Sequence, residues 1–161
     1  MSIILIANNK EEYILIPNEA IRVRVIANSN GDYDIKVKEE LKDYINIKLN
    51  NLIENINSIN EVRKVISKNL NNIHNYVDKK LKSMNYLKSF NINYGLNLFP
   101  EKEFKGVKYN SGLYESLVIT LGEGNGPNYW CVLYPPLCSI DTNKKDIEYR
   151  SFIKDLIDKY L

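Results

Sequence analysis

Alternating apolar and polar residues mark the first clear element of the chain. In residues 20–27, Ile and Val side chains alternate with Arg22 and Arg24, a pattern typical of a strand with one solvated face. The polar cluster 28–32 that follows ends in an aspartate, which can accept hydrogen bonds from the first free amides of a helix. We therefore predict a strand at 20–27 and a helix that starts near Tyr33.

Two long amphipathic helices are predicted next. The first keeps its apolar residues three or four positions apart, at Val37, Leu41, Tyr44, Ile45, Leu49 and Leu52. Ser58 and Glu61 form a Ser-x-x-Glu capping box at the start of the second, whose apolar stripe continues to about Asn85. Because the connection between them is short, we expect the two helices to pack antiparallel.

The apolar period then changes from helical to alternating, which indicates a return to strands. Residues 90–96 and 117–121 alternate, whereas residues 130–134 are continuously apolar and aromatic, as in a central strand. Two prolines end this last strand, because a proline has no amide proton to donate to a sheet. Residues 99–112 show no apolar period, so we expect a long loop there.

A short amphipathic helix at 152–160 closes the chain. At 161 residues, without a linker or an internal repeat, the chain has room for one ordinary domain, which we place at 17–161. The order of elements predicts an α+β fold. Its sheet is expected to be mainly antiparallel, with the two long helices and the C-terminal helix packed on one face.

Residues 1–16 form a separate N-terminal segment. Within it, residues 3–7 are a short, very apolar run that stops at polar residues 8–12. This run is either an N-terminal strand or frayed end, or the tail of a longer export signal. Nowhere does the chain reach the ~18 consecutive apolar residues of a membrane span.

Composition and charge exclude several classes of function. The 22 Lys and Arg nearly balance the 20 Asp and Glu, so a nucleic-acid partner is not expected. One histidine, His74, and two cysteines are too few for a structural zinc site, and we expect neither metal nor cofactor. A small hydrolase or transferase that uses Cys131 or Cys138 as its nucleophile remains the alternative, although no third, orienting residue stands out.

The glycine-rich segment 122–126 has two interpretations. It lacks the Gly-Lys-Ser/Thr ending of a phosphate-binding loop, and a strand rather than a helix follows it. A hairpin turn explains it more simply, because glycine tolerates positive φ. Three glycines in five residues exceed what a tight hairpin needs, and Glu123 lies among them, so a recognition role stays open.

Other candidate residues also have a structural and a functional interpretation. Cys131 and Cys138 are either two buried thiols or a disulfide closed by a proline-containing loop. The neighbouring pair Tyr129 and Trp130 suits a core or an interface. Arg22 and Arg24 are solvated in the simpler interpretation, and their spacing would also suit an acidic partner.

Three blocks of residues resemble the stage II sporulation protein R family. They are the run 21–30, the motif Gly112-x-Tyr114-Glu115-x-Leu117, and the segment 122–138 with its glycines, tryptophan, two prolines and two cysteines. The last block combines these rarer residues at fixed spacings, which makes it the most specific of the three.

The resemblance implies an exported, non-enzymatic signalling protein of endospore formation. Such a protein is secreted into the space between the forespore and mother-cell membranes and lies peripheral to the membrane. It activates a membrane-embedded aspartic protease, which then processes pro-sigma-E, and it takes no small-molecule substrate. The resemblance favours the Cys131–Cys138 disulfide. It also implies an export signal ahead of the domain, so that Met1 is an internal methionine or the chain has been shortened.

With this resemblance, we place the partner contacts in two loops, 122–128 and 99–112. The expected contact residues are Glu123, Asn125, Asn128, Tyr129, Arg22 and Arg24. The glycines expected to shape these loops are Gly112, Gly122, Gly124 and Gly126.

Overall fold

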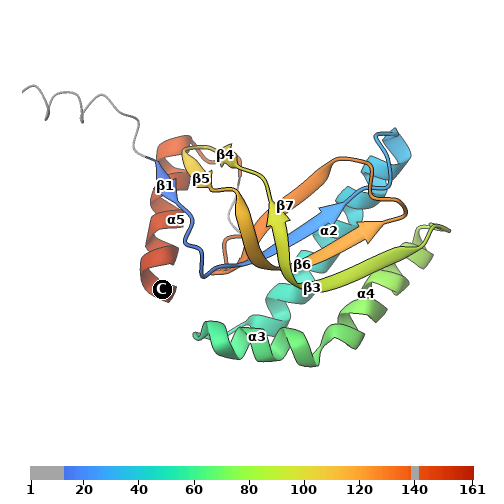
Figure 1. Cartoon of the computed structure of the whole chain (residues 1–161), viewed down its shortest axis with the longest axis horizontal. Coiled ribbons are helices and arrows are strands. Elements are labelled where there is room, and N and C mark those ends of the chain that lie inside the picture. The colour runs from blue at the N-terminus through green and yellow to red at the C-terminus, as the bar shows by residue number, and fades with distance from the viewer. Residues whose placement is uncertain (1–12, 139–141) are drawn as a thin grey trace, which may run out of the picture.

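The computed structural model describes residues 13–138 and 142–161, so the apolar run 3–7 lies outside the described residues. The elements are β1 (Ile14–Leu15), β2 (Ile21–Ile26), α2 (Asp32–Ile53), α3 (Ile59–Lys68), α4 (Leu70–Ser83), β3 (Phe90–Phe99), β4 (Lys102–Phe104), β5 (Val107–Tyr109), β6 (Gly112–Leu121), β7 (Asn128–Tyr134) and α5 (Asp146–Tyr160). The predicted single α+β domain is confirmed (Figure 1). None of the helices in the described ranges has the length and apolar character needed to cross a membrane.

Two sheets of mixed direction form the frame of the domain. The larger has the order β3-β6-β2-β7, and the smaller has the order β1-β5-β4. Three strand pairings are antiparallel, while β2 with β6 and β1 with β5 are parallel. The sheet is therefore mixed rather than purely antiparallel, because three helices and three strands separate β2 from β6 along the chain and allow the chain to return in the same direction.

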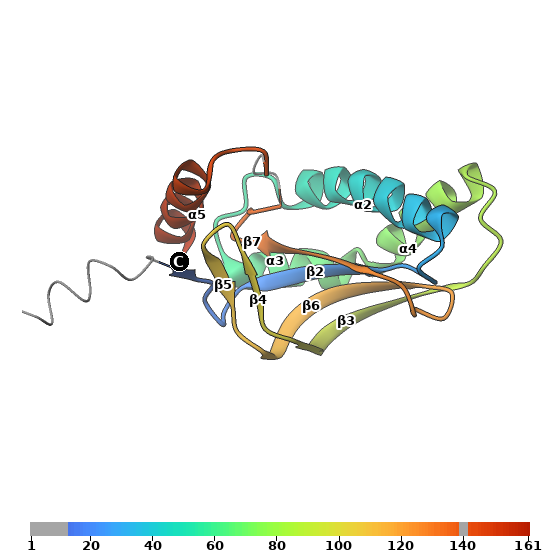
Figure 2. The same cartoon turned by 90° about the horizontal axis from the view of Figure 1, so that it is seen from above.

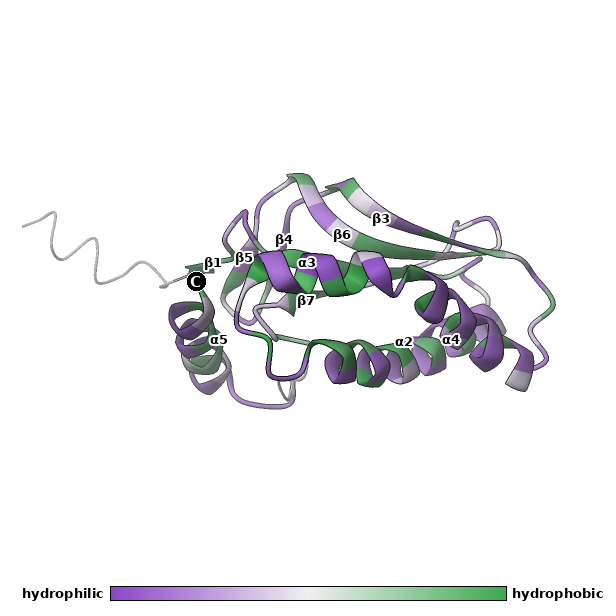
Figure 3. Ribbon diagram, turned by 90° about the horizontal axis from the view of Figure 1, so that it is seen from below, coloured by the Kyte–Doolittle hydropathy of each residue, from purple (hydrophilic) through white to green (hydrophobic). Residues whose placement is uncertain are grey.

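Helices α2, α3 and α4 cover one face of the four-stranded sheet and leave the other face without a helix (Figure 2). Hydrophobic and hydrophilic residues interchange along these helices (Figure 3), and buried apolar residues of all three helices belong to the core that they share with the sheet. Ile21, Val23 and Val25 of β2 belong to this core and are at most 1% exposed. The alternation of apolar and polar residues along β2 thus predicted correctly which side of the strand is buried under the helices.

The second predicted helix is in fact two helices. Asn69 interrupts it with φ −106° and ψ 12°, and its side-chain amide donates to the Val65 carbonyl at 2.8 Å. Asparagine competes for backbone hydrogen bonds in this way, which disfavours a helix interior. Ser58 does occupy the N-cap position of α3, but its hydroxyl makes no capping hydrogen bond, so the predicted capping box is not formed.

The predicted loop 99–112 is wrong, because it contains the hairpin of β4 and β5. Lys105 and Gly106 turn this hairpin with φ values of 49° and 80°. Strand β1 adds to β5, and α5 packs on this smaller sheet, at one end of the molecule, rather than beside α2–α4 (Figures 1 and 2). A second apolar cluster fills the space between them, with Ile16, Ala20, Val107, Val132, Leu137, Tyr149 and Ile153. Strands of three residues are too short to show a period in the sequence.

Strand β7 lies at an edge of the sheet, not at its centre as predicted. It is continuously apolar because both of its faces are covered. Cys131 and Leu133 pack on the core under the helices, whereas Val132 belongs to the second cluster. A strand with two buried faces has the same composition in either position.

The disulfide between Cys131 and Cys138 is present and closes a loop behind β7, with the two Cα atoms 5.3 Å apart. Reducing it should lower the free energy of unfolding by about 2–3 kcal/mol, because the unfolded chain regains the entropy of a short loop. Urea unfolding with and without reductant measures the difference. A variant with both cysteines replaced by serine serves as the control and should not respond to reductant; equal midpoints for the oxidised and reduced protein would contradict the expectation.

Candidate partner-binding surface

The glycine-rich turn between β6 and β7 is held against the loop that follows β2. The Gly126 amide donates to the Ala27 carbonyl at 2.9 Å, and the Asn125 amide donates to the Asn28 carbonyl at 3.0 Å. The Asn28 side chain accepts from the Glu123 amide at 2.9 Å. The same side chain donates to Asp34 at 2.8 Å, which connects the turn to the first turn of α2. Hydrogen bonding of Asn28 and Ser29 to Asp34 holds the pKa of that carboxyl below its ordinary value.

Close packing explains the surplus of glycines in this turn. A Cβ atom at Gly122 would overlap the Asn28 side chain, and one at Gly126 would overlap the Ser29 carbonyl. Gly122 and Gly124 also have positive φ values of 54° and 66°, which favour glycine. The glycines are therefore required for two reasons: they let two backbones approach closely, and they allow the backbone angles of the turn.

The side chains at the tip of the turn face solvent. Glu123, Asn125 and Asn128 are all exposed, and Asn125 donates to the Glu123 carboxylate at 3.3 Å. Their backbone is fixed while their side chains are free to contact another molecule. Their role as partner contacts remains a prediction.

Tyr129 and Trp130 point to opposite faces of the sheet. The Tyr129 hydroxyl accepts a hydrogen bond from Asn46 of α2 at 3.0 Å, and burial raises the pKa of this phenol. Trp130 lies on the face without helices, edge-on to Phe99 with 5.3 Å between the ring centres. Of this pair, only Trp130 therefore lies on the face without helices.

Arg22 is not solvated, so the predicted wet face of its strand is wrong at this position. Its side chain is 2% exposed, and its Cζ atom lies 3.6 Å from the centre of the Tyr114 ring. The rings of Phe99 and Tyr109 lie 5.3 and 5.6 Å away. Among the described residues, none of its guanidinium nitrogens has a hydrogen-bond partner. Burial lowers its pKa, and aromatic faces take the place of water around the cation.

Arg24 lies next to this cage and nearer the surface. One of its guanidinium nitrogens donates to the Leu98 carbonyl at 3.3 Å, and its Nε atom has no partner within the described chain. Strand pairing sets Arg24 opposite Trp130 and Ile26 opposite Asn128. The structure thus brings Arg24, Trp130 and Asn128 together on one face, as an extension of the glycine-rich turn.

Lys102 joins this group from β4, with Nζ 5.0 Å from the centre of the Trp130 ring. Lys102 lies within segment 99–112, where partner contacts were expected, but the sequence did not single it out because the segment was predicted to be a loop rather than a hairpin. Burial lowers the pKa of Lys102, and the same effect lowers that of Arg24. We refer to Arg24, Lys102 and Trp130 below as the cationic tryptophan site.

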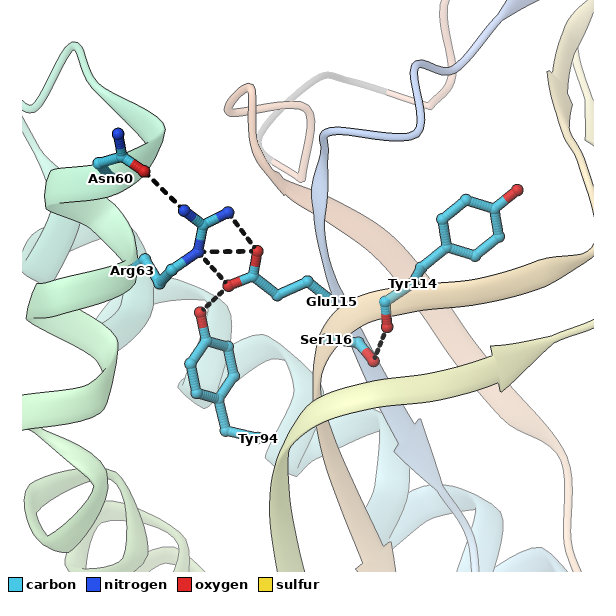
Figure 4. Close-up of polar contacts among 6 residues, drawn as sticks. All are labelled: Asn60, Arg63, Tyr94, Tyr114, Glu115 and Ser116. Carbon is cyan, nitrogen blue, oxygen red and sulfur yellow. Dashed lines mark hydrogen bonds and ion pairs between the residues drawn. The ribbon is translucent and has the colours of Figure 1, made fainter.

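A second polar cluster, also missed, joins α3 to the sheet (Figure 4). Arg63 donates to both oxygens of the Glu115 carboxylate, from Nε at 2.8 Å and from Nη2 at 2.7 Å. The Tyr94 hydroxyl donates to the same carboxylate at 2.5 Å, and Asn60 accepts from Arg63 at 2.6 Å. Arg63 and Glu115 are 52 residues apart in the sequence, so the pair gives no local signal. Glu115 thus connects elements, while its neighbour Tyr114 covers Arg22 on the opposite face.

The cysteine nucleophile proposed as an alternative is not available in this structure. Both sulfur atoms form the disulfide, so neither can act as a thiolate. His74 is on α4, where its ring lies 4.7 Å from that of Phe90. Within the described ranges, no three His, Cys, Asp or Glu residues are grouped so as to hold a metal ion.

The fold and this surface define a small, disulfide-containing α+β domain with helices on only one face of its larger sheet. The family model described as stage II sporulation protein R (spore_II_R) matches residues 17–144, and the chain belongs to this family. The resemblance found in the sequence is therefore confirmed. Membership assigns the chain a role in sporulation.

The comparison with one named relative agrees with this family assignment. The chain is 35% identical over 133 residues to stage II sporulation protein R of Bacillus subtilis (strain 168). The match covers 83% of this chain and 59% of that protein, so the chain spans less than two thirds of the relative's length. No solved structure matches the chain.

Packing of the turn predicts that Gly126→Ala destabilises the protein. The added Cβ would overlap a backbone carbonyl, and overpacking of this kind costs about 1–3 kcal/mol. Gly95→Ala is the matched control, because the nearest atom to its Cβ would lie at 3.8 Å and its φ is not positive. Thermal unfolding followed by circular dichroism compares the two. Equal melting temperatures would show that the turn can move away from the loop after β2.

The Glu115 cluster predicts a pH-dependent loss of stability. Hydrogen bonds from Arg63 hold the pKa of Glu115 below its ordinary value of 4.5. The contribution is therefore complete above that value and is lost as the pH falls through the lowered folded-state pKa. Glu115→Gln should cost about 1–2 kcal/mol at neutral pH, and the difference from wild type should shrink in acid.

Urea unfolding of both proteins at neutral and acidic pH measures this difference. Glu40→Gln is the control, because Glu40 is 43% exposed and forms only long ion pairs of 4.0 Å. It should change stability by less than about 0.5 kcal/mol at either pH. A difference between wild type and Glu115→Gln that does not change with pH would show that the carboxylate charge is not what stabilises the cluster.

Proposed function

We propose that this chain is an extracytoplasmic signalling protein of endospore formation that activates a membrane-embedded aspartic protease and thereby triggers processing of pro-sigma-E. Membership of the stage II sporulation protein R family is the observation that carries the proposal. The location proposed is the space between the forespore and mother-cell membranes, where the protein lies peripheral to the membrane.

The disulfide supports a location outside the cytosol. A Cys131–Cys138 bond persists in oxidising compartments, whereas glutathione and thioredoxin keep cytosolic thiols reduced. Because this bond removes both thiols from chemistry, activation by contact suits the chain better than catalysis by cysteine.

The glycine-rich turn supports activation through binding. Its backbone is fixed by hydrogen bonds to the loop after β2, so little conformational entropy is lost when it meets a partner. The side chains of Glu123 and Asn128 are exposed at its end, and within the described chain the Glu123 carboxylate hydrogen-bonds only to Asn125 of the same turn. A preformed loop with exposed polar side chains is a common form of recognition element.

The double variant Glu123→Ala/Asn128→Ala should lower pro-sigma cleavage about tenfold or more, equivalent to the loss of about 1.4 kcal/mol of binding free energy. Cleavage is measured after co-expression with the protease and its pro-sigma substrate. The melting temperature should be unchanged, because both side chains are exposed.

The matched control is Glu54→Ala/Asn57→Ala, which removes two exposed side chains of the same types from the connection between α2 and α3. It should leave cleavage unchanged. Undiminished cleavage by the turn variant would refute the placement of the contact. Absence of cleavage with the wild-type chain, in the presence of both other proteins, would refute the proposed function itself.

A further inference from the structure

Two cations at the cationic tryptophan site lack a counter-ion among the residues that the structure describes. Arg24 Cζ and Lys102 Nζ lie 5.8 and 5.0 Å from the centre of the Trp130 ring. Neither forms an ion pair with a carboxylate of the described residues, although other lysines and arginines of the chain do. The acidic neighbours of Lys102 in sequence, Glu101 and Glu103, are exposed.

This arrangement favours an anion from outside the described chain. Two like charges around one ring repel each other, and partial burial weakens their hydration. Each cation–π contact with the ring stabilises its cation by only about 0.5–2 kcal/mol, against this repulsion and loss of hydration. A carboxylate placed beside the ring would satisfy both cations and the unpaired Nε of Arg24.

A cavity of about 210 Å³ opens beside Trp130. Its lining includes residues 129–132, four consecutive positions of β7 whose side chains alternate between the two faces. The cavity therefore runs along the edge of the strand rather than over one face of the sheet. The hairpin contributes Lys102, Phe104 and Tyr109 to the same lining. Its volume lies below the ~300–1,000 Å³ typical of small-molecule sites and suits one side chain with a short length of backbone.

The edge of β7 that faces away from β2 offers backbone hydrogen bonds at the same place. The Val132 carbonyl points away from β2, where it accepts from the Leu137 amide at 3.1 Å. In an antiparallel pair, alternate residues direct both polar groups to the same side, so the amide and carbonyl of Trp130 face outward as well. No backbone group of the described residues bonds to them there.

We propose that the cationic tryptophan site docks an extended acidic segment of a partner protein. The segment's main chain bonds to the edge of β7 at Trp130, and one of its carboxylates lies between Arg24 and Lys102. Strand addition of this kind takes its affinity from the main chain and its specificity from the pockets beside it. A membrane surface fits less well, because recognition of anionic lipids relies on clusters of about 4–8 Lys or Arg. The inference rests on the proposed function only for the identity of the partner.

The single tryptophan of the chain makes the site directly observable. A short capped peptide of alternating Glu and Val, titrated into the intact protein, should change the Trp130 fluorescence in a saturable way. Raised salt should weaken the change, because part of the affinity is ionic. The matching Gln–Val and Lys–Val peptides should bind about tenfold more weakly or not at all, equivalent to about 1.4 kcal/mol or more.

Two variants test the cations. Lys102→Gln and Arg24→Gln/Lys102→Gln should weaken binding of the Glu–Val peptide, the double variant by about tenfold or more. The matched control, Lys64→Gln/Lys68→Gln, removes two exposed charges from α3 and should bind as wild type does. Within the described chain the ammonium group of Lys102 forms no hydrogen bond or ion pair, and its backbone pairing with β5 is kept in the variant, so Lys102→Gln tests the site without disturbing the fold.

Several results would overturn the proposal: no saturable change with the Glu–Val peptide, an equal change with the Gln–Val peptide, or undiminished binding by the double variant. Vesicles of anionic lipid that change Trp130 fluorescence more strongly than the peptide would assign the site to a lipid headgroup instead. In the cleavage assay, the wild-type chain and Arg24→Gln/Lys102→Gln could activate cleavage equally. That result would refute the inference and leave the proposed function standing. A wild-type chain that binds the peptide but activates no cleavage would refute the function and leave the inference standing.

Discussion

Burial of strand β2 on both of its faces is the constraint on which the rest of the structure depends. On one face its aliphatic side chains form the core beneath α2–α4. On the other face the guanidinium of Arg22 is enclosed by rings from β3, β5 and β6. Because a buried cation without hydrogen bonds is costly, these rings must stay in place, and the β4–β5 hairpin is held over the sheet with them.

The two candidate recognition elements are consequences of this frame. The loop that leaves β2 receives the glycine-rich turn, whose backbone approaches it too closely for any larger residue. The pairing of β2 with β7 sets Arg24 beside Trp130, and the hairpin adds Lys102. Both elements belong to residues 17–144, the part of the chain that matches the stage II sporulation protein R family. A rigid domain that presents a turn and an open strand edge is suited to signalling by contact.

Charged residues in this protein follow two different patterns. The charge of Glu115 is paired with Arg63, and Tyr94 donates a hydrogen bond to the same carboxylate, which connects a helix to the sheet. Arg24 and Lys102 are partly buried without a counter-ion in the described chain. Ion pairs of the first kind stabilise the fold, whereas uncompensated charges of the second kind favour a ligand of opposite sign. The contrast distinguishes a structural cluster from a binding site.

The sequence by itself determined the class of fold, the approximate positions of the long elements and the glycine-rich turn. These features have local signals: an apolar period or a cluster of turn residues. For Cys131 and Cys138 the residues left two thiols or a disulfide open, the family resemblance favoured the disulfide, and the structure contains it. Only the tertiary structure decided that Arg22 is buried, that β7 is an edge strand, that Asn69 divides a helix, and that Lys102 reaches Trp130. An apolar period shows which side of an element is buried in the core, but it carries no information about what packs on the polar side. That depends on contacts between residues far apart in the chain, and those contacts exist only after the chain has folded.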